Sequence, residues 1–120
     1  MRVATILVVD DSAFMRMRCI ATLKELGHEA VEAGDGRQAV DMYKQTKPQA
    51  VLMDITMPGV DGLTALREIL SIDPAARIAM VTAMGQQAIV MEAIKAGARD
   101  FVVKPFDPER VKAALKKLVG

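Results

Sequence analysis

Residues 6–11 of this 120-residue chain read ILVVDD. Four apolar side chains in a row, three of them β-branched, are followed at once by two aspartates. An uninterrupted apolar run, as opposed to an alternating one, is typical of a strand buried on both faces in a parallel sheet. The stretch therefore predicts a central strand of such a sheet, with two carboxylates at its carboxyl end.

Similar short apolar runs recur along the chain, at residues 30–31, 50–53, 78–81 and 101–103. Most are bounded by polar or turn-forming residues, and we interpret them as further strands buried on both faces. The run at 30–31 is the weakest and lies between two glutamates, which favours an edge strand. The spacing of the runs does not give the order of the strands in the sheet.

Helical patterns separate the apolar runs. The first expected helix has the apolar stripe Phe14, Met17, Ile20, Ala21 and Leu23, and the second starts at Asp35 with Gln38 placed for a capping box. The third follows Asp61-Gly62, and the fourth covers 88–94 and stops at Gly97. The fifth is capped by Asp107 and has Pro108 in its first turn. Alternating strands and helices with right-handed connections predict a three-layer α/β domain with a parallel sheet.

The overall composition limits the classes of function. The chain is 52% apolar, which excludes a disordered protein, and its 120 residues suit one domain. Its 16 basic and 15 acidic residues give a net charge of +1, which gives no support to direct nucleic-acid binding. The apolar runs are too short to span a membrane, and a lone cysteine, Cys19, is expected as a buried thiol in a reducing cytoplasm.

The polar residues that follow the apolar runs are the candidates for a functional site. In a parallel α/β sheet, ligands bind at the carboxyl ends of the strands. Five side chains are therefore expected at one edge of the sheet: Asp10, Asp11, Asp54, Thr82 and Lys104.

The chemistry of these five residues suits phosphoryl transfer. Three neighbouring carboxylates raise one another's pKa, and a hard cation such as Mg²⁺, which prefers oxygen ligands, removes that conflict. One carboxylate can then serve as the nucleophile. The ammonium and hydroxyl groups of the lysine and threonine would stabilise charge on a transferred phosphoryl group.

Each residue alone has a simpler explanation. Asp11 or Ser12 could cap the first helix, Asp54 could begin a turn, and Thr82 could be an ordinary strand residue. Lys104 could extend from the edge of the sheet into solvent. Complementary groups at the ends of successive strands nevertheless favour a site over unrelated capping residues.

Motifs along nearly the whole chain identify a family. They are Val8-Val9-Asp10-Asp11-Ser12, Met53-Asp54-Ile55-Thr56-Met57-Pro58 with Asp61-Gly62, Thr82-Ala83, Ala96-Gly97-Ala98 and Val103-Lys104-Pro105-Phe106. In this order they resemble the receiver domain of two-component response regulators, most closely the single-domain chemotaxis regulators. The stretch Met84-Gly85-Gln86-Gln87 is similar to the thermophile and Gram-positive branch of these regulators.

This resemblance implies one receiver domain over residues 1–120, with a flavodoxin-like fold of five helices around a five-stranded parallel sheet of order 2-1-3-4-5. Asp54 is the implied phosphoacceptor. Asp10, Asp11, Asp54 and the backbone carbonyl of Thr56 are the implied Mg²⁺ ligands. Lys104 and Thr82 are implied to contact the phosphoryl group, and the Lys104-Pro105 peptide is implied to be cis.

The resemblance also implies how the signal is passed on. Thr82 and Phe101 are the implied switch residues, and Val90 and Ile94 belong to a helix that contributes to the output surface. Relatives often have tyrosine where this chain has Phe101, so no hydroxyl is available there for a partner. Thr56 and Met84 occupy the positions that tune the phosphoryl lifetime. Neither supplies an acid or amide to orient water, so slow to moderate autodephosphorylation is expected.

The implied protein is mainly a signalling switch, although it catalyses its own phosphorylation and dephosphorylation. The implied partners are a chemotaxis-type histidine kinase, an output protein such as a flagellar motor switch component, and a phosphatase. A cytoplasmic monomer without membrane insertion is expected. The basic residues Arg110, Lys112, Lys116 and Lys117 are expected to form a solvated face or to meet an acidic partner.

Three other interpretations remain open from the sequence. A flavin-binding protein of the same architecture would need a phosphate loop after the first strand, where Asp10 and Asp11 would repel a phosphate. The receiver half of a transcriptional regulator would need an output domain, and the sequence ends at Gly120. A phosphorylation-independent pseudo-receiver scaffold could keep the same five site residues.

Overall fold

Strand and helix alternate five times among the residues that the computed structural model describes, which are 3–55, 57, 61–83, 86–104 and 107–119. The strands are β1 (Thr5–Val9), β2 (Glu29–Ala33), β3 (Ala50–Asp54), β4 (Ile78–Thr82) and β5 (Asp100–Val103). The helices are α1 (Ala13–Glu25), α2 (Gly36–Thr46), α3 (Gly62–Ile72), α4 (Gln87–Ala96) and α5 (Pro108–Val119).

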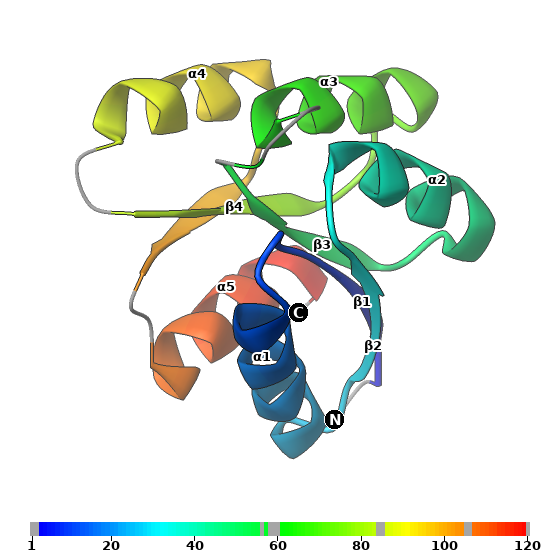
Figure 1. Ribbon diagram of the computed structural model, residues 1–120, viewed down its shortest axis with the longest axis vertical. Helices are drawn as coiled ribbons and strands as arrows, with labels where there is room; N and C mark the ends of the chain where they lie inside the picture. Colours follow the sequence, from blue (N-terminus) through cyan, green and yellow to red (C-terminus); the bar gives the residue numbers. More distant parts are fainter. Residues whose placement is uncertain (1–2, 56, 58–60, 84–85, 105–106, 120) are drawn as a thin grey trace.

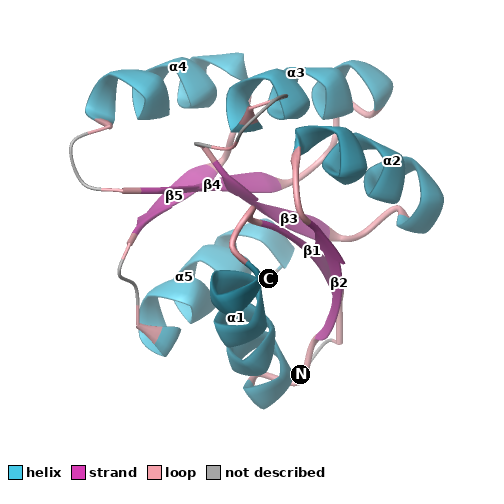
Figure 2. Ribbon diagram, in the orientation of Figure 1, coloured by secondary structure: helices cyan, strands magenta, loops and turns pink. Residues whose placement is uncertain are grey.

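The strands form one parallel sheet in the order β2-β1-β3-β4-β5 (Figure 2). This confirms the order that the family resemblance implied and places β2 at an edge, as its flanking glutamates predicted. The register aligns Val9 with Met53, Asp54 with Val81, and Thr82 with Val103. The carboxyl ends of β1, β3, β4 and β5 therefore lie along one edge of the sheet.

The helices cover the two faces of the sheet as separate layers (Figure 1). Helices α2, α3 and α4 pack on one face, where their apolar residues join Leu7, Val51 and Met80 in one core cluster. Helices α1 and α5 pack on the other face with Ile6 and Leu52. Neighbouring residues of a central strand thus enter different cores, which explains why β1, β3 and β4 are apolar without interruption.

Strand β5 departs from the prediction that the run 101–103 is buried on both faces. Val102 is buried, whereas Phe101 and Val103 are 39% and 37% exposed. Phe101 pairs with Met80 of β4, so it points to the face that carries α4. This edge strand has no further strand beyond it, and α4 leaves that face of β5 partly uncovered.

The predicted apolar stripe of α1 is also partly wrong. Phe14 and Met17 are 63% and 65% exposed, whereas Cys19 and Leu23 are the buried residues of this helix. The helix rests on the sheet with one narrow face, so Phe14, Met17 and Ala21 point to solvent, while Ile20 is partly buried against the core. The prediction that Cys19 is buried is confirmed.

Side-chain caps fix where the helices begin. Ser12, Asp35 and Asp61 accept hydrogen bonds from the first turns of α1, α2 and α3, and Asp107 accepts one from Arg110 at the start of α5. The expected capping box of α2 differs in one respect, because Gln38 accepts from the N–H of Gly34, the residue before the cap. Within the described part of the chain, no helix is long and apolar enough to cross a membrane.

Candidate functional site

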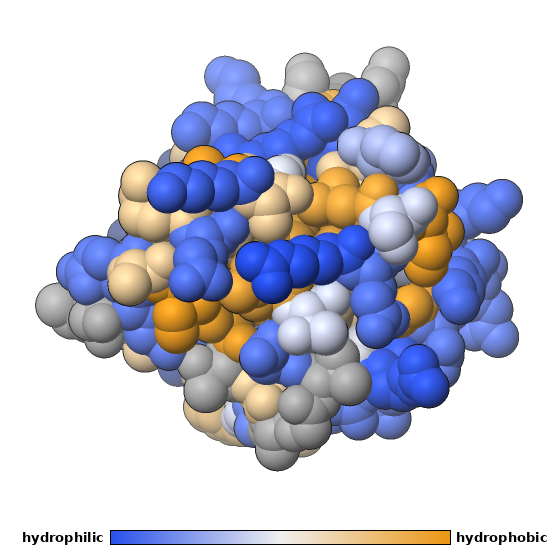
Figure 3. Space-filling view, turned by 90° about the horizontal axis from the view of Figure 1, so that it is seen from above, coloured by the Kyte–Doolittle hydropathy of each residue, from blue (hydrophilic) through white to orange (hydrophobic). Residues whose placement is uncertain are grey.

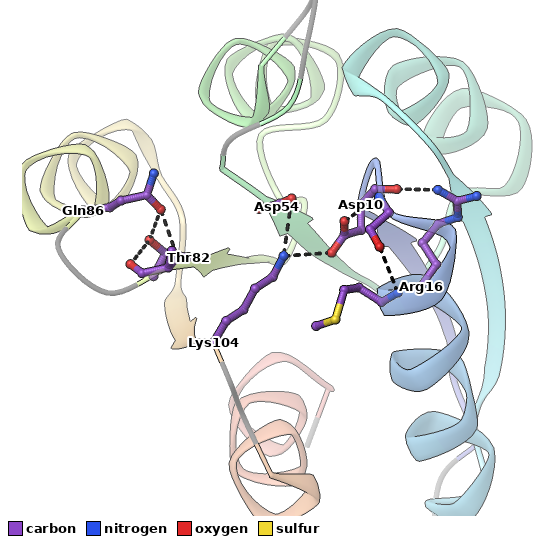
Figure 4. A network of polar contacts seen from close by, with 9 residues as sticks. Asp10, Arg16, Asp54, Thr82, Gln86 and Lys104 are labelled. Atoms are coloured by element: carbon purple, nitrogen blue, oxygen red, sulfur yellow. Dashed lines mark hydrogen bonds and ion pairs between the residues drawn. The ribbon is translucent and has the colours of Figure 1, made fainter.

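The carboxylates of Asp10, Asp11 and Asp54 meet at the carboxyl edge of the sheet, where Figure 4 shows those of Asp10 and Asp54. One oxygen from each lies within 4.8 Å of the others. Asp10 follows β1 and Asp54 ends β3, and each is only 6% exposed, whereas Asp11 is exposed to solvent. The parallel pairing of β1 with β3 brings together acids that are 44 residues apart in the chain.

Lys104 provides the positive charge at this cluster. Its Nζ lies 3.0 Å from Asp10 Oδ2 and 3.5 Å from Asp54 Oδ2. The backbone N–H of Lys104 donates to the Thr82 carbonyl oxygen, which continues the pairing of β5 with β4 and aims the lysine across the strand ends. Burial disfavours the ammonium, but the hydrogen bond to Asp10 and the charge of Asp54 outweigh it and raise the pKa of Lys104.

The pKa of Asp54 is raised to about 6. Burial is the largest cause, the charge of Lys104 opposes it, and the negative charges of Asp10 and Asp11 add to it. The carboxyl group is thus mostly ionised above neutral pH, although water solvates it poorly. A poorly solvated carboxylate that faces an entering electrophile is suited to act as a nucleophile.

Two further residues fix the backbone around the cluster, and the sequence analysis did not single out either role. Arg16 of α1 donates from its guanidinium to the Asp10 carbonyl oxygen at 2.5 Å and pairs with Glu32 of β2 at 2.9 Å. Gly62 starts α3 so close to β3 that a Cβ atom would lie 2.0 Å from the Asp54 carbonyl oxygen. In the sequence, the only sign of the close approach of Gly62 to Asp54 is that a glycine follows Asp61, the residue that caps α3.

Thr82 lies at the same edge, but its hydroxyl bonds away from the cluster. The hydroxyl oxygen lies 2.7 Å from Gln86 Oε1 and 3.0 Å from the Ala83 carbonyl oxygen (Figure 4). The sequence analysis quoted Gln86 only as part of a family motif. Because a hydroxyl has a single proton, it donates to one of these acceptors at a time.

The donor set fits a hard divalent cation. Three carboxylates and one ammonium leave two negative charges uncompensated when all are ionised, and carboxylate oxygens are the ligands that such cations prefer. The cluster is also open on one side, since Asp11 is exposed. Thr56, Met84 and Pro105, which the sequence analysis also named, lie outside the described residues.

The predicted switch and output residues lie beside one another at β5 and α4. Val90 is buried, whereas Ile94 and Phe101 are 38% and 39% exposed. Thr82, Val90, Met91 and Phe101 line a groove of about 440 Å³ between the two elements. Figure 3, which looks onto the layer of α2, α3 and α4, shows apolar surface in patches among polar side chains.

Two of the four basic residues of α5 contact an acidic residue of the chain itself. Arg110 and Lys117 pair with Asp100 of β5 at 3.2 and 3.7 Å, and Arg110 also donates to the Phe101 carbonyl oxygen. Burial raises the pKa of Asp100, but the hydrogen bonds and charges of Arg110 outweigh it, so the net shift is downward. These contacts tie α5 to the edge strand.

Comparison with known proteins agrees with this geometry. Residues 6–116 match the model of the response regulator receiver domain. The chain belongs to this family. It is 56% identical to the chemotaxis protein CheY of Thermotoga maritima, with 94% of this chain and 95% of that protein covered. It is 57% identical to CheY of Bacillus subtilis, with 96% and 97% covered.

Solved receiver structures show the same fold. The chain superposes on CheY in the CheX-CheY-BeF3-Mg+2 complex of Borrelia burgdorferi with a TM-score of 0.88, 35% identity and coverage of 92% and 85% of the two chains. It superposes on NtrX of Brucella abortus with a TM-score of 0.91 and 33% identity, covering 98% of this chain but only 27% of NtrX.

This chain is therefore a CheY-like chemotaxis response regulator whose acidic cluster serves phosphorylation. The interpretation as a flavin-binding protein is excluded. The resemblance that the motifs implied is confirmed over nearly the full length, and the acidic cluster is consistent with the divalent metal site typical of receivers.

Proposed function

We propose that residues 1–120 form one receiver domain that accepts a phosphoryl group on Asp54 from a chemotaxis-type histidine kinase, with Mg²⁺ as the cofactor. The observation that carries the proposal is the position of the Asp54 carboxylate, buried at the strand ends with Asp10 and Asp11 beside it and Lys104 Nζ at 3.5 Å. Among the described acidic residues only Asp10 shares this combination, and both of its carboxylate oxygens already accept hydrogen bonds, from the Ser12 N–H and from Lys104 Nζ.

In the proposed reaction an oxygen of Asp54 attacks the phosphorus of the donor. The bond from phosphorus to the phosphohistidine nitrogen, or to the oxygen of a small acyl phosphate, breaks, and the donor keeps the electron pair. Lys104 stabilises the charge on the transferred oxygens. Later a water molecule attacks phosphorus, the bond to Asp54 breaks, and inorganic phosphate and a proton are released.

Asp10, Asp11, Asp54 and the backbone carbonyl of Thr56 would hold Mg²⁺. When bound, the ion would neutralise the negative charge of the site and polarise the phosphoryl oxygens. Asp10 is positioned for this role by its own contacts, since its Oδ1 accepts from the Ser12 N–H at 2.8 Å and Arg16 holds its backbone carbonyl. Thr56 and Met84 would tune the lifetime of the phosphoryl group.

Phosphorylation would draw the Thr82 hydroxyl to the phosphoryl oxygens and let Phe101 turn inward, which changes the surface formed by α4 and β5. The groove beside Phe101 supports an output protein there, such as a flagellar motor switch component. A phosphatase is a further proposed partner. In support, a relative has been solved in a complex with a second protein, the complex named CheX-CheY-BeF3-Mg+2. We propose a cytoplasmic monomer that does not bind nucleic acid.

The proposed reaction is tested by mass spectrometry of the intact protein after incubation with acetyl phosphate and Mg²⁺. The wild type should gain the mass of one phosphoryl group, Asp54→Asn should gain none, and the wild type in excess chelator should gain none. Asp41→Asn, which removes an exposed carboxylate from α2, should behave as wild type. Stoichiometric uptake by Asp54→Asn would overturn the assignment of Asp54.

A further inference from the structure

The side-chain amide of Gln86 joins the last residue of β4 to the start of α4. Its Oε1 lies 2.7 Å from the Thr82 hydroxyl oxygen and 2.9 Å from the backbone nitrogen of Ala83. The Ala83 N–H can only donate, so the amide atom facing it must be the carbonyl oxygen. The Thr82 hydroxyl therefore donates to Gln86 when it takes this 2.7 Å contact.

This use of Gln86 is unusual among the helix starts of the described chain. Ser12, Asp35, Asp61 and Asp107 turn their side chains onto N–H groups of the helices that they precede. Gln86 occupies the same position before α4, but its side chain makes no capping hydrogen bond there. Its amide oxygen instead accepts from the end of β4.

The contact with Gln86, at 2.7 Å, is the shorter of the two that the Thr82 hydroxyl makes, the other being to the Ala83 carbonyl oxygen at 3.0 Å. Thr82 is 2% exposed, so water does not offer its hydroxyl an easy alternative partner. In Figure 4 the Thr82 side chain meets Gln86, while Lys104 extends to Asp54 and Asp10 on the other side. For Thr82 to donate to a phosphoryl oxygen on Asp54, its proton must leave Gln86.

We propose that Gln86 is a positioning residue that holds the Thr82 hydroxyl in the unphosphorylated protein and competes with the phosphoryl group for it. The inference rests on the proposed role of Thr82 in phosphorylation. Formation of phospho-Asp54 replaces the Thr82–Gln86 hydrogen bond by one from Thr82 to a phosphoryl oxygen. The strength of the lost bond sets how readily the active conformation forms.

The same exchange connects the phosphorylation site to the output groove. Thr82 and Gln86 line the groove together with Val90 and Phe101. When Thr82 turns to the phosphoryl group, Gln86 loses one of the hydrogen bonds of its side chain and keeps the one from the Ala83 N–H. The start of α4 is then held to β4 by one fewer hydrogen bond, at the place where Phe101 is proposed to move.

The test measures the beryllofluoride concentration that half-saturates the protein in Mg²⁺, followed by nuclear magnetic resonance. Removing one neutral hydrogen bond from the unphosphorylated state should lower this concentration by about fivefold in Gln86→Ala. Gln86→Met, which keeps the side-chain length but lacks the acceptor, should do the same. Gln87→Ala is the matched control, because Gln87 is the next residue, is exposed and makes no described contact with Thr82.

A double-mutant cycle separates this role from a structural one. In a Thr82→Ala background the hydroxyl is absent, so Gln86→Ala should no longer change the half-saturating concentration. In a Thr82→Ser background, where the hydroxyl is retained, the fivefold decrease should return. An equal effect of Gln86→Ala with and without the hydroxyl would overturn the proposal, because it would show a general effect on α4.

The outcomes for the wild type distinguish this inference from the proposed function. A wild type that takes up neither beryllofluoride nor the phosphoryl group of acetyl phosphate overturns both. A wild type that takes up both probes, with Gln86→Ala and Gln86→Met indistinguishable from it, overturns the competition alone. In unphosphorylated Gln86→Ala the Ala83 N–H loses its acceptor, so its hydrogen exchange should also be faster. Unchanged exchange would contradict the hydrogen bond from Ala83 to Gln86.

Discussion

At the scale of single residues, the burial of Asp54 makes its ionisation unfavourable for folding. Its folded pKa of about 6 lies above its ordinary value of 3.8, so the folded protein binds this proton more tightly than the unfolded chain does. The contribution of Asp54 to stability is therefore lost as pH rises from about 4 to above 6. Lys104 reduces this loss but does not remove it.

We expect Asp54→Asn to raise the free energy of unfolding above pH 7 in the absence of divalent cations. The full shift corresponds to about 3 kcal/mol, and solvent screening in the open site reduces the expected gain to about 1–2 kcal/mol. Lys104 keeps its partner Asp10 in this variant. Urea denaturation at pH 7.5 and pH 4 checks the prediction, and a variant no more stable than wild type at pH 7.5 would contradict it.

Cys19 is a second residue whose burial sets its chemistry. Burial is the largest cause that raises the pKa of its thiol to about 11, with a smaller contribution from the charge of Asp10. Thiolate is then about 100-fold scarcer at pH 8 than in an unshifted cysteine. We expect native protein to react with iodoacetamide at least that much more slowly than urea-unfolded protein, as followed by mass spectrometry. Comparable rates would refute the burial of Cys19.

The sequence predicted the site residues whose signal is their position after an apolar run. Asp10, Asp54 and Lys104 meet at the carboxyl edge of the sheet, as their positions after the strands predicted. The parallel arrangement of the strands brings those ends to the same edge. Arg16 and Gln86 escaped prediction for a physical reason. Both act from helix starts through the direction of a flexible side chain, and a polar residue at such a place is otherwise an ordinary surface or capping residue.

At the scale of elements, the contact between α3 and β3 fixes the backbone of the phosphorylation site. A Cβ on Gly62 would lie 2.0 Å from the Asp54 carbonyl oxygen and 2.9 Å from the Ile55 Cα, both backbone atoms that cannot turn away. The Gly62 N–H also donates to the Ile55 carbonyl oxygen at 3.0 Å. Any side chain here must push α3 away from the end of β3.

We therefore expect Gly62→Ala to lower the free energy of unfolding by about 3 kcal/mol and to slow phosphorylation of Asp54. Gly34→Ala is the matched control, because its Cβ would meet only the ends of two flexible side chains, at 3.4 Å, and should change stability by less than about 1 kcal/mol. Denaturant unfolding of both variants checks this, and equal stabilities would show that α3 shifts without cost.

The elements also show where sequence patterns fail. Strands β1, β3 and β4 were predicted correctly because helices cover both of their faces, so every position is apolar. Strand β5 has an equally apolar run, but it lies at the edge, and composition does not record that α4 leaves Phe101 partly exposed. The strand order itself came from the family resemblance, since spacing along the chain does not determine lateral position.

At the scale of the whole molecule, negative charge is concentrated at one edge of a chain whose net charge is only +1. A cation that binds the folded cluster but not the unfolded chain stabilises the fold by mass action. At ten times its dissociation constant, Mg²⁺ should add about 1.4 kcal/mol, which for a domain of this size raises the unfolding temperature by about 6 °C.

This stabilisation should depend on the cluster and not on ionic strength. Asp11→Asn removes an exposed ligand carboxylate and should reduce the shift at the same Mg²⁺ concentration, whereas Glu92→Gln, which removes an exposed carboxylate from α4, should leave it unchanged. Sodium chloride at matched ionic strength should give no comparable shift, because a monovalent ion does not neutralise the two uncompensated charges. Thermal unfolding of the three proteins in both salts measures this, and an equal shift in Asp11→Asn would place the bound cation elsewhere.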